Sequence, residues 1–317
     1  AYGQVPSNTQ LTIIYRYGGG INNNIIANTL RSIQSANIEL DETGLNANLA
    51  ATTKNSIAVN NPQPATGGRS AESIIEVKNN ALAYFQAQQR AVTKEDYIAR
   101  VYALPPKYGN VAKAYIVQDT QLDSQSGANS DSRIINPLAL NMYLLGFDAN
   151  KKLVTVNQAV KENIQTYLTQ FRMVTDAINI KNAFVINIGV KFNVLTKVGY
   201  NKEEVVLKSI QRVKDFFNID KWQIGQPIVL ADLAYQISLV DGVSAVVPPE
   251  EDNPNGHPVL ITNKFKVGSG YSGNAYDIVG ATRGGVVYPS LDPSCFELKY
   301  PNIDIEGRAV GNSTGGN

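Results

Sequence analysis

The segment from Phe184 to Thr196, FVINIGVKFNVLT, alternates cleanly between apolar and other side chains. Successive side chains of a strand point to opposite faces, so the segment predicts a long strand with one apolar face. That face would carry Phe184, Ile186, Ile188, Val190, Phe192 and Val194. Asn187, Lys191 and Asn193 lie opposite, and we expect this second face to meet water.

Helical patterns flank this strand in the sequence. We expect one helix to begin at Asn157 and a second near Asn201, and a third to cover Leu230–Leu239. Further strands are predicted at Leu138–Phe147 and Val243–Val247. The order strand, helix, strand, two helices, strand predicts a two-layer module over residues 131–249, with helices on one side of one sheet.

The regions on either side of that module predict further units. Residues 1–130 are expected to form an N-terminal α+β module with strands at Leu11–Tyr17 and Asn110–Gln118 and a helix through Ile25–Ile33. Residues 250–317 are rich in Gly, Pro, Tyr and Asn, and predict a loop-rich tail of short strands that packs on another module or on a neighbour. The fold class expected is therefore multidomain α+β. Because the chain begins at Ala1 with AYGQVPSNTQ, we expect it to be a piece of a longer protein.

Two helix starts stand close together in GGRSAESIIEVKNNALAYFQAQQRAVTKEDY, residues Gly67 to Tyr97. In the first predicted helix, Ser70 is the expected N-cap, Glu72 suits the positive end of the helix dipole, and four apolar residues share one face. These residues are Ile74, Val77, Ala81 and Phe85. In the second, Thr93 and Asp96 have the spacing of a capping box, and Val92 and Tyr97 have that of a hydrophobic staple.

Composition excludes several classes of function. The 28 basic and 27 acidic residues give a net charge of +1, which provides no broad field for nucleic acid or an anionic membrane. One cysteine and one histidine exclude internal disulfides, thiolate metal clusters and sites built from several histidines. No apolar run approaches the roughly 18 residues of a membrane helix, so no membrane insertion is expected. We expect no catalytic residue, cofactor or resident metal.

The alternative to a non-enzymatic protein is a nucleotide- or ligand-binding protein that uses a glycine-rich loop. Gly268, Gly270 and Gly273 have the dinucleotide-binding spacing, and Asp292 follows about 20 residues later. That motif also requires a helix directly after the loop, and the sequence after Gly273 has no helical period. Gly18–Gly20 is a second candidate loop, but no Gly-Lys-Ser/Thr follows it. We expect glycine-rich turns at both places.

Other groups of residues give weaker indications of a functional site. Glu250, Glu251 and Asp252 precede His257 and could bind a cation, although we expect a solvated loop there. Three further acids, Asp119, Asp123 and Asp131, miss the calcium-loop spacing. Cys295 would need a base to act as a nucleophile, and we expect it to be inert. A carbohydrate-binding surface could use Tyr271, Tyr276 and Tyr288, which we expect at core edges or subunit interfaces.

The two helix starts also carry a family resemblance. GGRSAES, a helix, and then RAVTKEDYIARV resemble the signature of the baseplate-J-like proteins of contractile phage tails and related injection machines. The matching residues are Gly67, Gly68, Glu72, Ser73, Arg90, Val92, Thr93, Asp96 and Tyr97. The resemblance implies a virion structural protein whose dimers link wedges into a ring around the tail hub, with other baseplate wedge proteins as partners. It supplies no active site, and it implies that the matched residues set a turn, helix caps and a staple.

Overall fold

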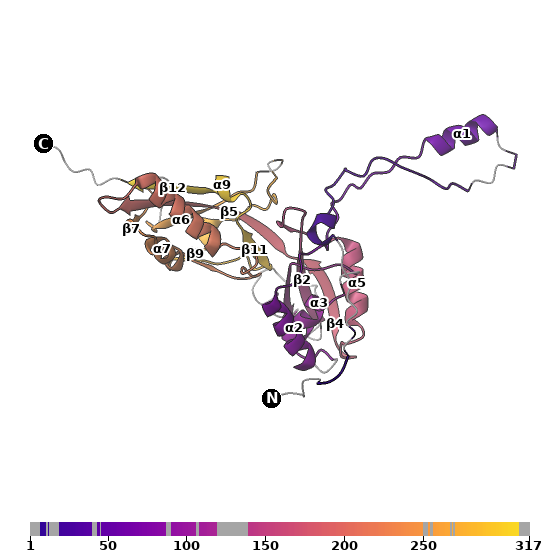
Figure 1. The fold of residues 1–317 in the computed structure, drawn as a ribbon, viewed down its shortest axis with the longest axis horizontal. Coiled ribbons are helices and arrows are strands. Elements are labelled where there is room, and N and C mark those ends of the chain that lie inside the picture. Colours follow the sequence, from indigo (N-terminus) through magenta and orange to yellow (C-terminus); the bar gives the residue numbers. More distant parts are fainter. Residues whose placement is uncertain are drawn as a thin grey trace, which may run out of the picture.

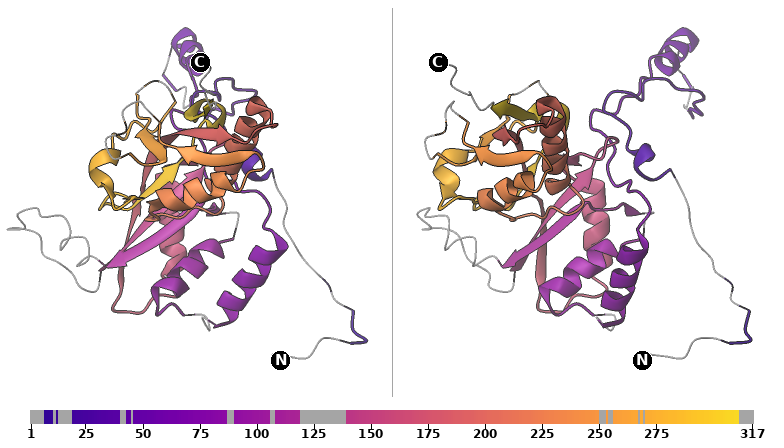
Figure 2. Two further views of the ribbon diagram at one scale, coloured as in Figure 1. Left: turned by 90° about the vertical axis from the view of Figure 1, so that its left-hand side faces the viewer. Right: turned by 60° about the vertical axis from the view of Figure 1, so that its left-hand side comes forward.

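The computed structural model describes residues 7–10, 12, 19–39, 43–44, 46–86, 90–105, 108–118, 139–249, 253, 256–266, 268 and 270–310. It confirms an α+β fold that contains several sheets. Figures 1 and 2 show two packed bodies, each with its own sheet, and a long arm that leaves the first of them.

The first sheet is built around strand β2 (Ala139–Phe147). Its other strands are β1 (Lys113–Gln118), β3 (Leu153–Val154) and β4 (Ala177–Asn182). Strands β1 and β3 pair with β2 antiparallel, and β4 pairs with it in parallel. Helices α3 (Lys94–Tyr102) and α5 (Gln158–Leu168) pack on one face, where their apolar side chains form a core with Met142 and Leu144. As expected, Asn157 caps α5.

The second sheet is built around β5 (Phe184–Thr196), the strand that the alternating sequence predicts. Strands β11 (Ser294–Glu297) and β12 (Ile305–Val310) run parallel to its first and later parts. Strands β8 (Val259–Asn263) and β7 (Val243–Val247) pair with it antiparallel. The helices of this body are α6 (Lys202–Phe216), α7 (Leu230–Ser238), α8 (Ile278–Ala281) and α9 (Pro301–Asp304). A small third sheet joins β6 (Ile228–Val229), β10 (Val286–Val287) and β9 (Thr282–Arg283).

The second face of β5 meets water only in its later part, where Lys191 and Asn193 are partly exposed. Asn187 on this face is fully buried. Its Nδ2 donates a hydrogen bond of 2.8 Å to the buried carboxylate of Glu297, and its Oδ1 accepts one of 2.7 Å from the backbone N–H of Ser272. The prediction was wrong for Asn187 because alternation in one strand cannot show that residues from a distant loop and strand cover this part of its polar face. Such buried polar groups are tolerated when they are paired.

The two bodies share buried residues of β2. Met142 and Leu144 belong to the first core, whereas Tyr143, Leu145 and Phe147 belong to the second core together with β5 and β11. Since successive side chains of a strand point to opposite faces, β2 lies between the two cores and is apolar on both sides. Only Ala183, which is buried, separates β4 from β5, so a nearly continuous strand passes from one sheet into the other.

Strand pairing crosses the limits of the three predicted units. Strands β2 and β4, from residues 131–249, join β1 from residues 1–130. Strands β8, β11 and β12, from residues 250–317, pair with β5, so the C-terminal tail packs on its own chain. The single sheet expected for residues 131–249 is therefore wrong: β2 and β4 lie in one sheet, and β5 and β7 in another.

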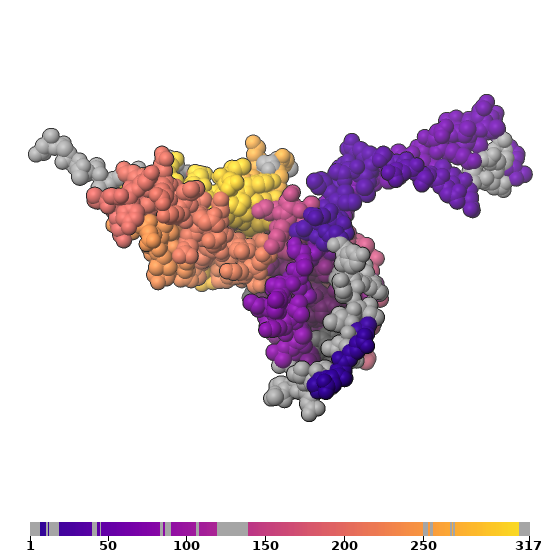
Figure 3. Space-filling model, in the orientation of Figure 1, coloured from indigo at the N-terminus to yellow at the C-terminus, as the bar shows by residue number. Residues whose placement is uncertain are grey.

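Residues 25–39 and 46–65 belong to an extended arm, where a helix through Ile25–Ile33 was expected. The backbone here is extended because it pairs with the returning chain: Asn28 N donates to Asn61 O at 2.7 Å, and Ala65 N donates to Ile25 O at 2.8 Å. Helix α1 (Ala47–Asn55) lies at the far end of the arm, well away from both bodies (Figures 1 and 3). The strand expected at Leu11–Tyr17 lies outside the described residues, apart from Thr12.

Candidate functional site around Gly67–Tyr97

The glycine pair at the start of the signature lies where backbone segments meet closely. A Cβ atom on Gly68 would come within 2.2 Å of the carbonyl oxygen of Gly20. Gly67 has a φ of +108°, a conformation that favours glycine, and its carbonyl accepts a 2.8 Å hydrogen bond from Asn110 N. The pair therefore fixes the base of the arm against the loop that leads into β1.

Asn24 holds this junction together from inside. It is buried, and its Nδ2 donates to the carbonyl of Gly68 at 3.0 Å and to that of Phe147, at the end of β2, at 2.9 Å. Its Oδ1 accepts from the backbone N–H of Gly68 at 2.7 Å. One amide side chain thus joins the 3₁₀ helix η1 (Gly20–Asn23), the glycine pair and the first sheet. The three-asparagine run at residues 22–24 predicts turns and caps, but not this junction.

Helix α2 (Ile74–Gln86) begins four residues after Ser70, the expected N-cap. Ser73 caps it instead: its Oγ accepts from Glu76 N at 3.2 Å, and its own N–H donates to the Glu76 carboxylate at 2.7 Å. The reciprocal pair satisfies two N–H groups at once, an arrangement that a cap at Ser70 does not have here. The Ser73 backbone N–H is the largest cause of the lowered pKa of Glu76, which also pairs with Arg69 at 2.7 Å.

Helix α3 begins with the capping box that the sequence predicts. Thr93 Oγ1 accepts from Asp96 N at 3.2 Å, and the Asp96 carboxylate accepts from Thr93 N at 2.9 Å and from Val92 N at 3.1 Å. Burial alone would raise the pKa of Asp96, but these backbone N–H groups, the Thr93 hydroxyl and nearby Arg100 together lower it. Asp96 is therefore held in its ionised form by the helix start.

The two staple residues differ in burial. Tyr97 is buried, and its hydroxyl donates a 2.7 Å hydrogen bond to Asp176. Burial, followed by this hydrogen bond, raises the pKa of Tyr97. Val92 is more than half exposed. The buried Arg100 guanidinium, one turn further along α3, lies 4.4 Å from the centre of the Phe171 ring, within the range of a cation–π contact.

Five large apolar residues of α2 are exposed on the surface of the protein. Ile74, Ile75, Val77, Leu82 and Phe85 are 76%, 71%, 49%, 54% and 69% exposed. Among the side chains of this helix that the structure describes, the half-buried ones are polar, Glu76 and Asn80, and Asn80 Nδ2 donates to Glu72 at 2.7 Å. The periodicity thus predicts the helix, but here it does not indicate which face the protein covers.

The glycine-rich loop near Gly268 does not have the form of a dinucleotide site in the described residues. Gly270, at φ +84°, packs against the Tyr300 hydroxyl, where a Cβ atom would come within 2.4 Å. The next helix, α8, has four residues and begins at Ile278 with Asp277 as its cap, so no long helix presents its N-terminus to the loop. Gly20 at the earlier glycine run opens η1, which is also four residues long.

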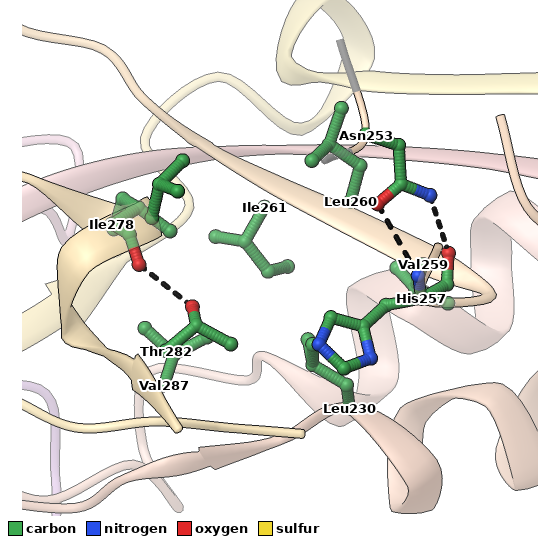
Figure 4. Close-up of a pocket in the computed structure, with 10 residues that line it drawn as sticks. Leu230, Asn253, His257, Val259, Leu260, Ile261, Ile278, Thr282 and Val287 are labelled. Atoms are coloured by element: carbon green, nitrogen blue, oxygen red, sulfur yellow. Dashed lines mark hydrogen bonds between the residues drawn. The ribbon is translucent and has the colours of Figure 1, made fainter. Parts of the chain in front are cut away.

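A small hollow lies beside His257, between β8, α8 and the start of α7 (Figure 4). Most of its lining is apolar, including Val259, Ile261 and Ile278, and Asn253 is hydrogen-bonded to the backbone of His257. Its space of about 20 Å³ would hold about one water molecule and is too small for a nucleotide.

Several remaining candidates are buried or hydrogen-bonded within the protein, others lie outside the described residues, and the Tyr288 side chain is exposed. Cys295 is fully buried, and burial raises the pKa of its thiol to about 12. The hydroxyl of Tyr271 donates to Asp304 at 2.5 Å, and that of Tyr276 donates to the Tyr288 carbonyl at 2.7 Å. The acidic candidates outside the described residues are Asp119, Asp123, Asp131, Glu250, Glu251 and Asp252.

A metal site and a membrane-crossing helix each have plain structural requirements, which the described part of the chain does not meet. No group of three or more His, Cys, Asp or Glu residues there could hold a metal ion. None of the helices described combines the length and the apolar character needed to cross a membrane.

Comparison with known proteins finds a structural likeness but no family match. No family model matches the sequence, and no curated protein matches it. Among solved structures, the chain is similar to a chain in the cryo-electron microscopy structure of the anti-feeding prophage baseplate, in its six-fold symmetrised form. The two are 14% identical with a TM-score of 0.42, and the match covers 76% of this chain and 45% of the other. The chain thus matches less than half the length of that neighbour.

Proposed function

We propose that this chain is a non-enzymatic structural subunit of a contractile-tail baseplate. Its resemblance to the baseplate-J-like signature supplies the class, and the C-terminal half of the baseplate wedge protein of T-even-type phages is the member it resembles most. In this proposal the chain forms dimers that link wedges into a ring around the hub. The ring rearranges when the sheath contracts. Assembly takes place in the host cytoplasm, and the mature location is the virion baseplate.

One observation carries the proposal: the signature residues are used to build structure. Gly68 allows two backbone segments to approach closely, Ser73 and Thr93 cap helices, and Asp96 accepts backbone hydrogen bonds. Tyr97 is buried and bonded to Asp176. None of these residues lines the hollow beside His257. A segment that specifies rigid packing in this way suits a subunit whose work is to hold neighbours in a fixed arrangement.

The extended arm supports an assembly function in a second way. Helix α1, at the tip of the arm, buries Ala50 and leaves Leu49 exposed. Ile26 and Ile57 are exposed elsewhere along the arm. Monomeric proteins rarely expose many large apolar side chains on a projecting segment, whereas subunits of assemblies bury them against neighbours.

The test is the location of the chain in purified contractile particles. Antibodies raised against the chain should label the baseplate end of intact tails in electron micrographs, and particles made without the chain should lack closed baseplates. Labelling elsewhere, or normal baseplates in its absence, would refute the proposal. Calorimetry with NAD and ATP tests the alternative of a nucleotide-binding protein, for which the proposal expects no heat of binding.

A further inference from the structure

The chain passes from the first body into the second without a free linker (Figure 1). Ala183, the single residue between β4 and β5, is buried, and its N–H donates a 3.1 Å hydrogen bond to the carbonyl of Leu144 in β2. The next N–H, that of Phe184, donates to the Pro293 carbonyl at 3.0 Å. A hinge is made of residues that absorb a large change in φ and ψ. Here such a change would break both hydrogen bonds and expose Ala183.

Phe147, at the end of β2, joins three parts of the chain. Its side chain belongs to the second core, and its backbone pairs with Leu153 in β3 of the first sheet. Its carbonyl oxygen accepts the 2.9 Å hydrogen bond from Asn24 Nδ2 at the base of the arm. Because packed interiors resist gradual deformation, a change in the angle between the bodies would have to remove Phe147 from a core or from its backbone partners.

A buried carboxylate crosses the boundary between the two bodies. Glu297 lies in β11 of the second sheet and is buried. Its Oε1 accepts a 2.7 Å hydrogen bond from the backbone N–H of Leu153 in β3, and its Oε2 accepts one of 2.8 Å from Asn187 Nδ2 in β5. Each oxygen thus has a donor, one from each body. Separation of the bodies would take the Leu153 donor away from a buried carboxylate, which is costly.

A buried lysine makes a similar connection in the opposite direction. Lys113, in β1 of the first sheet, is buried, and its Nζ donates a 3.1 Å hydrogen bond to the backbone carbonyl of Asp220, which follows α6 in the second body. Nearer the surface, Lys151 pairs with the Asp220 carboxylate at 2.6 Å. Each body therefore places one buried ionisable side chain against the backbone of the other, and motion between the bodies would separate both pairs.

We propose that the two bodies and the base of the arm form one rigid block, and that Glu297 holds the block together at the boundary. This inference rests on the proposed function and says where the ring can change. When the sheath contracts, the contacts between subunits rearrange, whereas the angle between the two bodies of each subunit stays fixed. A displacement of the second body is then passed to the base of the arm through Phe147 and Asn24.

The distance between two spin labels tests the rigid block. Gln165→Cys on α5 of the first body and Val198→Cys in the turn between β5 and α6 of the second body place labels at exposed positions. Cys295, the single native cysteine, is buried and should stay unlabelled. Pulsed electron paramagnetic resonance of the doubly labelled chain, diluted with unlabelled chain, should give one narrow distance distribution. A broad distribution, or two distances, would overturn the rigid block.

Two variants of Glu297 in the labelled chain test its part. Glu297→Met keeps the length of the side chain but removes both acceptors, so the distance distribution should broaden. Hydrogen exchange of the Leu153 amide should become at least about tenfold faster, because the N–H loses a charged acceptor. Glu297→Gln, a milder change for use if the methionine variant does not fold, can accept only one of the two hydrogen bonds and should broaden the distribution less.

The matched control is Glu306→Met in the neighbouring strand β12. Glu306 pairs with Lys191 and Lys264, which both belong to the second body, so its loss should leave the distance distribution and the Leu153 exchange unchanged. Equal effects of the Glu306 and Glu297 changes, or a narrow distribution that survives both Glu297 changes, would overturn the part given to Glu297. None of these results bears on the antibody test of baseplate location, so failure of the rigid block is distinguishable from failure of the proposed function.

Discussion

Replacement of Asn24 by aspartate tests the junction between the arm and the first sheet. The substitution keeps the shape of the side chain but replaces the Nδ2 donor with an oxygen. That oxygen would lie about 3 Å from the carbonyl oxygens of Gly68 and Phe147, where Nδ2 now donates hydrogen bonds of 3.0 and 2.9 Å. The variant loses two donors and gains a buried negative charge that faces two acceptors.

The cost can be worked from these contacts. Each lost hydrogen bond is worth about 1 kcal/mol net, and an uncompensated buried charge brings the total to about 3–5 kcal/mol at pH 7. Burial beside two carbonyl oxygens should raise the pKa of the new carboxyl in the folded state. The folded state then binds more protons than the unfolded state between the two pKa values, so the free energy of unfolding of Asn24→Asp should rise as the pH falls through that window.

Two measurements check this prediction. Urea unfolding followed by circular dichroism, repeated from pH 7 down to pH 4, gives the free energy of unfolding. Hydrogen exchange of the Gly68 amide, which donates to Asn24 at 2.7 Å, reports local opening if the arm detaches before the rest unfolds. Asn22→Asp is the matched control, because Asn22 is exposed and should tolerate the charge. If Asn24→Asp stayed within about 0.5 kcal/mol of this control and kept its Gly68 protection, the junction would not be held by Asn24.

Four further results are expected. Thr93→Ala should lower the free energy of unfolding by about 1 kcal/mol in urea titrations, whereas no loss would show that the capping box contributes nothing. Since the pKa of Asp96 is lowered in the folded state, the contribution of its ionised form should be complete above about pH 4 and lost as the pH falls further, which acid titration of Asp96→Asn against the parent can measure. Cys295 should resist alkylation in the native protein at pH 8 and react after unfolding, and rapid native labelling would contradict its burial. Gly68→Ala should destabilise the chain by more than a surface change does, because its Cβ would come within 2.2 Å of a backbone oxygen; an unchanged midpoint would show that the arm base moves freely.

Local sequence was sufficient wherever the determining contacts are close in the chain. The capping box at Thr93, the Asn157 cap of α5 and the long strand β5 were all predictable, because each depends on residues a few positions apart or on one regular period. The failures have a common cause. The arm at residues 25–65 is held by pairing with the returning chain about 35 residues later, and its apolar residues mimic helical spacing.

The α+β class, the starts of α3, α5, α6 and α7, and the absence of a disulfide framework could be read from the sequence, since they follow from periodicity, capping chemistry and a single cysteine. Which face of each element is covered depends instead on the tertiary structure. It buried Asn187 against Glu297, placed β2 between two cores, and left the apolar side of α2 exposed. The physical reason is that a period shows which side chains share a face, whereas the partner that covers the face comes from residues far away in the chain.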